Sequence, residues 1–182
     1  YVCLDAVQDG DVVRVVGSIW HPEPSSPNPA GPNGGFTNIV LRVPPGVAVY
    51  LQTPAGKVAL DGLTGTVEAH VDMGSIEAKS MTGDLILRTS AGRISVTNAA
   101  IKEELSLTTS MGDIEFEGSL GARNHVEVSA GRVQMTVPRS TCVRLDAATN
   151  AGQVNTNMSV TERKSEAMKS SAVGILGEGQ PT

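Results

Sequence analysis

The residues of this sequence that could do chemistry are three histidines, His21, His70 and His125, and a scatter of carboxylates. His70 and Asp72 are separated by one residue, so on a strand both side chains would lie on the same face. An imidazole beside a carboxylate is the beginning of a metal site, but no third ligand follows at a suitable spacing. The alternating pattern around His70 and His125 places both on solvated strand positions. The sequence therefore predicts no metal site.

Four carboxylates, Asp72, Glu77, Asp113 and Glu115, recur close to glycines. A solenoid enzyme that acts on polysaccharides would gather such carboxylates on one exposed sheet face. Here the outward positions mix Glu, His, Arg, Ser and Gln, so a solvated charged face explains them more simply. The Gly-x-Ser-x-Gly, His-Glu-x-x-His and P-loop motifs are absent from the sequence. We therefore expect no catalytic residue, no cofactor and no enzymatic activity.

Any functional site of the chain must be positioned by six copies of one short sequence motif. The copies are LQTPAGKVAL, AHVDMGSIEA, LRTSAGRISV, LTTSMGDIEF, VEVSAGRVQM and AATNAGQVNT. Their glycines are Gly56, Gly74, Gly92, Gly112, Gly131 and Gly152, which lie 18, 18, 20, 19 and 21 residues apart. Self-similar content with a period near 20 residues is typical of stacked repeat architectures. We predict that the glycines are structural corners and not a ligand site.

Apolar residues and threonines stand at fixed offsets from each glycine and alternate with polar residues, which predicts strands with one buried face. The buried positions lie five and three residues before each glycine and two and four residues after it. Ala or Met precedes every glycine, which favours a type II turn; such a turn splays the flanking strands. The prediction is an all-β, stacked-strand β-solenoid, similar to a right-handed parallel β-helix, of about six rungs.

The chain of 182 residues is expected to form a single β-solenoid domain. Residues 1–48 would cap one end, with a hairpin around Asp9-Gly10-Asp11, an exposed loop rich in Pro and Gly at 21–35, and a strand at Thr37–Val43. Residues 49–158 form the repeat ladder. Residues 159–182 are an irregular C-terminal segment, which is either a short helix at Val160–Lys169 or an excursion before a strand at Ala172–Leu176.

Composition excludes several classes of function. The net charge is −5 and Lys and Arg are scattered singly, so we expect no nucleic-acid partner. No run of 18 apolar residues exists, and no direct insertion into a membrane is predicted for this segment.

Cys3 and Cys142 either form one disulfide or remain free thiols. Asn157-Met158-Ser159 is a formal N-glycosylation sequon, relevant only if the protein is secreted in a eukaryote.

The repeats resemble a known family. The stretch VALDGLTGTVEAHVDMGSIEAKSMTGDLILRTSAGRISV, residues 58–96, is similar to the DUF4097 adhesin family, also called toastrack. The similarity extends from about Asp9 to Thr182 and includes the Val43-Pro44-Pro45-Gly46-Val47 junction, whereas the loop at 21–35 departs from it. The resemblance implies a stacked-strand solenoid without enzymatic activity. It also implies a place at the cell envelope or outside the cell in bacteria, or in an organelle in a eukaryote.

We therefore expect a non-enzymatic binding or adhesion scaffold that contacts a protein or a glycan. The alternative is a structural accessory subunit, whose edge strands and loops dock into a larger assembly. A polysaccharide-active enzyme that uses Glu77 and Glu115 is the least favoured hypothesis.

Overall fold

The computed structural model describes residues 2–19, 39–41, 46–138, 144–157, 162–166 and 169–175. Every regular element within these ranges is a strand, and none is a helix. The strands are β1 Val2–Asp9, β2 Val12–Ile19, β3 Ile39–Leu41, β4 Ala48–Ala55, β5 Val58–Asp61, β6 Thr64–Met73, β7 Ile76–Lys79, β8 Thr82–Ala91, β9 Ile94–Met111, β10 Ile114–Ser119, β11 Arg123–Thr136, β12 Arg144–Thr156, β13 Glu162–Glu166 and β14 Lys169–Ile175.

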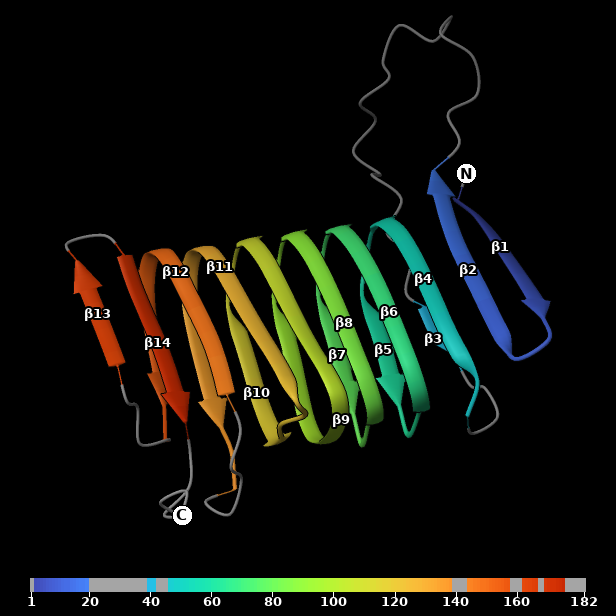
Figure 1. Ribbon diagram of the computed structural model, residues 1–182. Coiled ribbons are helices and arrows are strands. Elements are labelled where there is room, and N and C mark those ends of the chain that lie inside the picture. Colours follow the sequence, from blue (N-terminus) through green and yellow to red (C-terminus); the bar gives the residue numbers. More distant parts are fainter. Residues whose placement is uncertain are drawn as a thin grey trace, which may run out of the picture.

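The strands stack in parallel into a β-solenoid, as predicted, with about five turns where about six were expected (Figure 1). Each turn supplies a longer strand to one face and a shorter strand to the other. The long face contains β4, β6, β8, and residues 101–111, 123–130 and 144–151 of β9, β11 and β12. The short face contains β3, β5, β7, residues 94–100 of β9, β10, and residues 133–136 and 153–156 of β11 and β12. The three longest strands therefore contribute to both faces.

The space between the two faces is filled by thin layers of aliphatic side chains. The positions predicted to be buried at fixed offsets from the glycines are buried in every copy except at Thr156, which is half-buried. Ile76, Leu87, Ile94, Leu107 and Ile114 are among the largest side chains that are fully enclosed. Each such side chain contributes about 1.5 to 3 kcal/mol relative to an exposed one, so the stack is stabilised by many small, repeated increments.

The corner glycines are not the type II turns that the sequence suggested. Their φ angles lie between 134° at Gly56 and 155° at Gly152, whereas the second central residue of a type II turn has φ near +80°. The cause is the close stacking of one corner on the next. A Cβ atom on Gly74 would overlap the carbonyl oxygen of Gly56, and the same collision recurs up the stack to Gly152. The corner thus requires glycine both for its φ angle and for the approach of the neighbouring backbone.

Both ends of the long face carry antiparallel strands. The predicted N-terminal hairpin is present as β1 and β2, and β2 then pairs in parallel with β4. At the other end β14 pairs antiparallel with β12, and β13 pairs with β14. Glu162–Glu166 is a strand, so the alternative of a helix at 160–169 is wrong; the expected strand is present but begins earlier, at Lys169. The loop at 21–35, His21 and Cys142 lie outside the described residues.

Candidate binding surface

Parallel stacking in register lines up the outward side chains of the long face into rows that run across the strands. One row, called the Tyr50 row below, consists of Tyr50, Glu68, Ile86, Ser106, His125 and Asp146. The next, called the His70 row, consists of Gln52, His70, Arg88, Thr108, Glu127 and Ala148. Neighbouring side chains within a row stand about 4.8 Å apart, so the face presents a regular and mostly polar array.

His70 and Asp72 meet as their spacing predicted. Nε2 of His70 lies 3.0 Å from Oδ1 of Asp72, and the imidazole donates that hydrogen bond when Nε2 carries its proton. Across the part of the chain that the structure describes, no three His, Cys, Asp or Glu side chains come together in a way that could hold a metal ion. The pair is therefore a surface contact between two exposed side chains.

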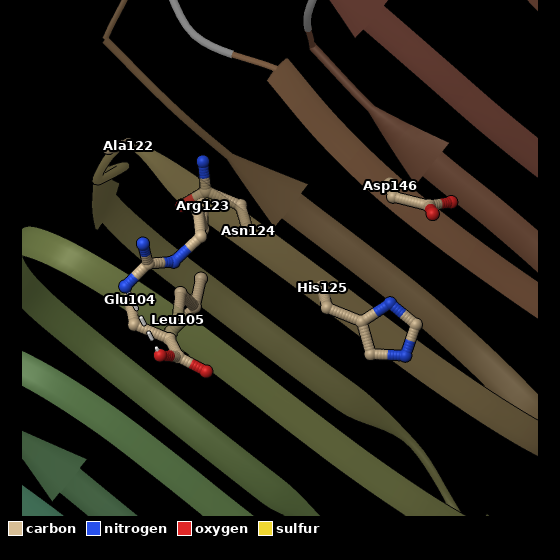
Figure 2. Close-up of a pocket in the computed structure, with 7 residues that line it drawn as sticks. All are labelled: Glu104, Leu105, Ala122, Arg123, Asn124, His125 and Asp146. Carbon is tan, nitrogen blue, oxygen red and sulfur yellow. Dashed lines mark ion pairs between the residues drawn. The ribbon is translucent and has the colours of Figure 1, made fainter.

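A hollow of about 250 Å³ on the long face lies beside His125 (Figure 2). Its lining residues are Glu104, Leu105, Ala122, Arg123, Asn124, His125 and Asp146. Arg123 Nη2 lies 3.5 Å from Glu104 Oε2, and Nε2 of His125 lies 3.6 Å from Glu127 Oε2. Arg123 and Glu104 thus form an exposed ion pair at the rim, which contributes at most about 1 kcal/mol.

The register of this region also aligns Ser106, His125 and Asp146 on three neighbouring strands. The sequence interpretation missed this alignment, although all three stand six residues before a corner glycine. A nucleophile, a base and a carboxylate in one line would suit acyl transfer only if hydrogen bonds connected them. Within the described residues no hydrogen bond joins His125 to Ser106 or Asp146, and the imidazole faces Glu127 instead. The alignment is therefore not an assembled triad.

The N-terminal end of the long face carries an exposed apolar patch, which we call the Tyr50 patch and which consists of Val7, Val16 and Tyr50. Their exposed fractions are 54%, 36% and 37%. Arg14 on β2 pairs with Val7 on β1 and with Tyr50 on β4, so Val7, Arg14 and Tyr50 stand in one line across the three strands. The sequence around Tyr50 alone does not indicate these neighbours, because they come from β1 and β2, which stack beside β4.

A hollow of about 290 Å³ runs beside this patch. It is lined by Arg14, Val15, Val16, Tyr50, Leu51, Gln52, Glu68 and His70. Apolar side chains, an aromatic ring, a guanidinium, an amide and a carboxylate thus converge on one shallow surface. Of the histidines and carboxylates singled out from the sequence, only His70 contributes to it.

Two of the carboxylates near the corners of the short face, Glu77 and Asp113, interact with residues of the solenoid itself. Glu77 Oε1 lies 2.6 Å from Lys57 Nζ, while Asp113 accepts a hydrogen bond of 3.0 Å from the backbone N–H of Arg132. Glu115 lies in a hollow of about 140 Å³ whose other lining residues are Ser95, Val96, Thr97, Phe116, Glu117, Gln134 and Thr136. Glu77 and Glu115 are separated by one intervening strand, or about 10 Å of backbone, so they do not converge on one position.

Comparison with known proteins adds no assignment. No family model, curated protein or solved structure matches the chain. None of the described segments forms a helix that could span a bilayer.

Proposed function

We propose that this chain is a non-enzymatic binding module of the adhesion-scaffold type, which holds a protein partner on the Tyr50 patch and the hollow beside it. The observation that carries the proposal is the grouping of Val7, Val16 and Tyr50 on three adjacent strands of a stacked sheet. The three side chains surround Arg14, and such a group of exposed apolar residues suits an interaction site better than singly scattered ones do.

The chemistry of the patch suits a protein better than a glycan. Tyr and Arg are the residue types that most often carry binding energy at protein interfaces, and Tyr50 and Arg14 stand side by side. A flat sheet also positions these side chains without a large cost of loop ordering. Among the described residues Tyr50 and Phe116 are the aromatic ones, and Phe116 is buried, so one ring alone is offered for stacking on a sugar. The resemblance to the DUF4097 adhesin family supports a binding role.

The test is capture of a partner by the full chain, followed by purification of that partner and measurement of its dissociation constant. Tyr50→Ala combined with Arg14→Glu should weaken binding by about tenfold or more, because the two side chains are neighbours and both line the hollow. Gln134→Ala on the short face is the matched control and should leave the affinity unchanged. Equal affinities for the wild type and the double variant would refute the proposed surface.

The alternative of an accessory subunit is favoured by the strands that end the long sheet, β1 and β13, each of which pairs with a single neighbour among the described residues. A subunit would elute from native extract at the mass of a fixed complex. Elution as a stable monomer would count against this alternative and leave the binding module in place.

A polysaccharide-active enzyme remains the third candidate and is opposed by the separation of Glu77 from Glu115. Its test is hydrolysis of a polysaccharide panel by the wild type and by Glu77→Gln and Glu115→Gln variants. Hydrolysis that both substitutions abolish would replace the non-enzymatic proposal.

A further inference from the structure

β1 is the last strand at the N-terminal end of the long sheet. It spans eight residues and, among the described residues, pairs only with β2. In an antiparallel ladder, hydrogen-bonded pairs alternate with pairs that direct their backbone groups away from each other. Closure of the hairpin at Gly10-Asp11 makes Asp9 and Val12 a hydrogen-bonded pair, so Gln8 and Ala6 direct their N–H and C=O groups to the free edge.

Apart from the carboxylates of Asp5 and Asp9, β1 has few of the features that usually protect edge strands. β1 contains no Lys and no Pro, and its register with β2 runs without a bulge from Val2 to Asp9. The opposite edge is different, because β13 is five residues long and four of them are charged. The two ends of the sheet are therefore not equivalent, and none of the described segments pairs with the outer edge of β1.

The outward side of β1 has a definite chemistry. Val7 is 54% exposed, and Asp5 and Asp9 flank it on the same face at a spacing of two residues. The charged residues of the hairpin, residues 2–19, are Asp5, Asp9, Asp11 and Arg14, so its net charge is −3 + 1 = −2. A strand that added to this edge would need an aliphatic side chain opposite Val7 and cations opposite the two carboxylates.

We propose that β1 is an acceptor edge for an extended, basic polypeptide segment of the pattern basic-x-aliphatic-x-basic, which lengthens the long sheet by one strand. The inference rests on the proposed binding function, since it names the chemistry of the segment that would run beside the Tyr50 patch. A second copy of β1 fits poorly. That copy carries no cation, so no antiparallel register places a positive charge opposite Asp5 or Asp9. Pairing centred on Val7 even places Asp5 opposite Asp9, and pairing centred on Asp5 places that carboxylate opposite itself.

In the experiment, the full chain is titrated with the blocked peptide acetyl-Thr-Lys-Thr-Val-Thr-Lys-Thr-amide. Binding is monitored by two-dimensional NMR of the backbone amides of the chain. The peptide should shift the amide signals of residues 2–9 and protect the amides of Ala6 and Gln8, and its affinity should fall as salt is added. Ala6→Pro should weaken binding by about tenfold, because proline removes a donor from the free edge. Val7→Lys should weaken it similarly by repelling the peptide, whereas the matched surface variant Gln134→Lys should not.

A charge exchange tests the proposed chemistry without altering the backbone. The peptide with Glu in place of Lys should not bind the wild type but should bind the double variant Asp5→Lys/Asp9→Lys. The proposal is overturned if β1 shows no shift up to about 1 mM peptide, or if the exchanged pair fails to bind. It is equally overturned if the chain is a dimer with β1 at its interface, or if the Ala6 and Gln8 amides are already protected in the free monomer by the chain's own residues. In each of these cases partner capture that depends on Tyr50 would leave the proposed function standing.

Discussion

The carbonyl oxygen of Gly74 occupies the position that a side chain on Gly92 would need. The same relationship links each later corner glycine to the one a turn before it. The line of six glycines therefore allows the turns to stack closely. Neighbouring corners are then near enough for backbone hydrogen bonds, such as the 2.8 Å bond that Gly92 N donates to Met111 O.

Gly92→Ala should therefore lower the free energy of unfolding by about 3 kcal/mol or more, because the added methyl group strikes backbone that cannot move alone. The measurement is denaturant unfolding followed by circular dichroism. Gly62→Ala is the matched control, since Gly62 also has a positive φ but has open space where a Cβ would lie. That variant should lose only about 1 to 2 kcal/mol from its backbone conformation. Equal losses in the two variants would argue against backbone stacking as the reason for glycine.

Ile94→Asp should unfold the stack or lower its unfolding free energy by about 4 kcal/mol or more, because it buries an unpaired carboxylate in the central layers. Ile94 is fully buried, and its strand pairs with both β7 and β10. The control is Thr97→Asp, an exposed position on the same strand, which should change stability by less than about 0.5 kcal/mol. An unshifted thermal transition for Ile94→Asp would contradict the assigned core.

Thr149→Val should stabilise the protein by about 1 kcal/mol. The hydroxyl of Thr149 is buried without a hydrogen-bond partner among the described residues, and valine has nearly the same shape without the desolvation cost. Thr109→Val is the comparison, because its hydroxyl donates to the carbonyl oxygen of Met111 at 3.4 Å and that bond would be lost. Differential scanning calorimetry should show a higher melting temperature for the first variant than for the second. The reverse order would indicate that Thr149 has a partner.

Asn157 should resist N-glycosylation in a eukaryotic secretory host, although it lies in a sequon. Its Nδ2 donates to the carbonyl oxygen of Val137 and its Oδ1 accepts from the N–H of Val137, both at 2.9 Å. Intact-mass spectrometry should find the unmodified chain. Asn157→Ala should cost about 1 to 2 kcal/mol of stability, whereas Asn155→Ala at an exposed position should be neutral. A glycan on Asn157 would show that these two bonds open before the protein has folded.

Much of the fold could be predicted because the buried positions of each strand lie at fixed sequence offsets from the glycines. Once Gly92 is known to be a corner, Leu87, Thr89, Ile94 and Val96 must all point inward, since strand side chains alternate with a period of two. The corner geometry could not be predicted in this way. The φ angle near 150° accompanies close stacking on the backbone of the preceding turn, which local turn preferences do not contain.

The candidate binding surface was harder to foresee than the core. Tyr50 gains its apolar neighbours only because β2 joins the parallel stack, and the pairing of Arg14 with Tyr50 bridges 36 residues of chain. No alternation within either strand specifies that pairing. The Ser106, His125 and Asp146 alignment could have been found, because the offset of six residues from the corner glycines is constant. Its lack of hydrogen bonds is a matter of side-chain orientation, which offsets do not determine.

The series order of the turns determines how the protein would respond to a pulling force. β1 and β13 lie at opposite ends of the sheet, so tension between them loads the interfaces between turns one after another (Figure 1). Each turn that peels away would release about 20 residues, or roughly 70 Å of extended chain. A solenoid tethered at one end and bound to a partner at the other would therefore lengthen stepwise under load, and each released turn would lower the tension on the bond to the partner.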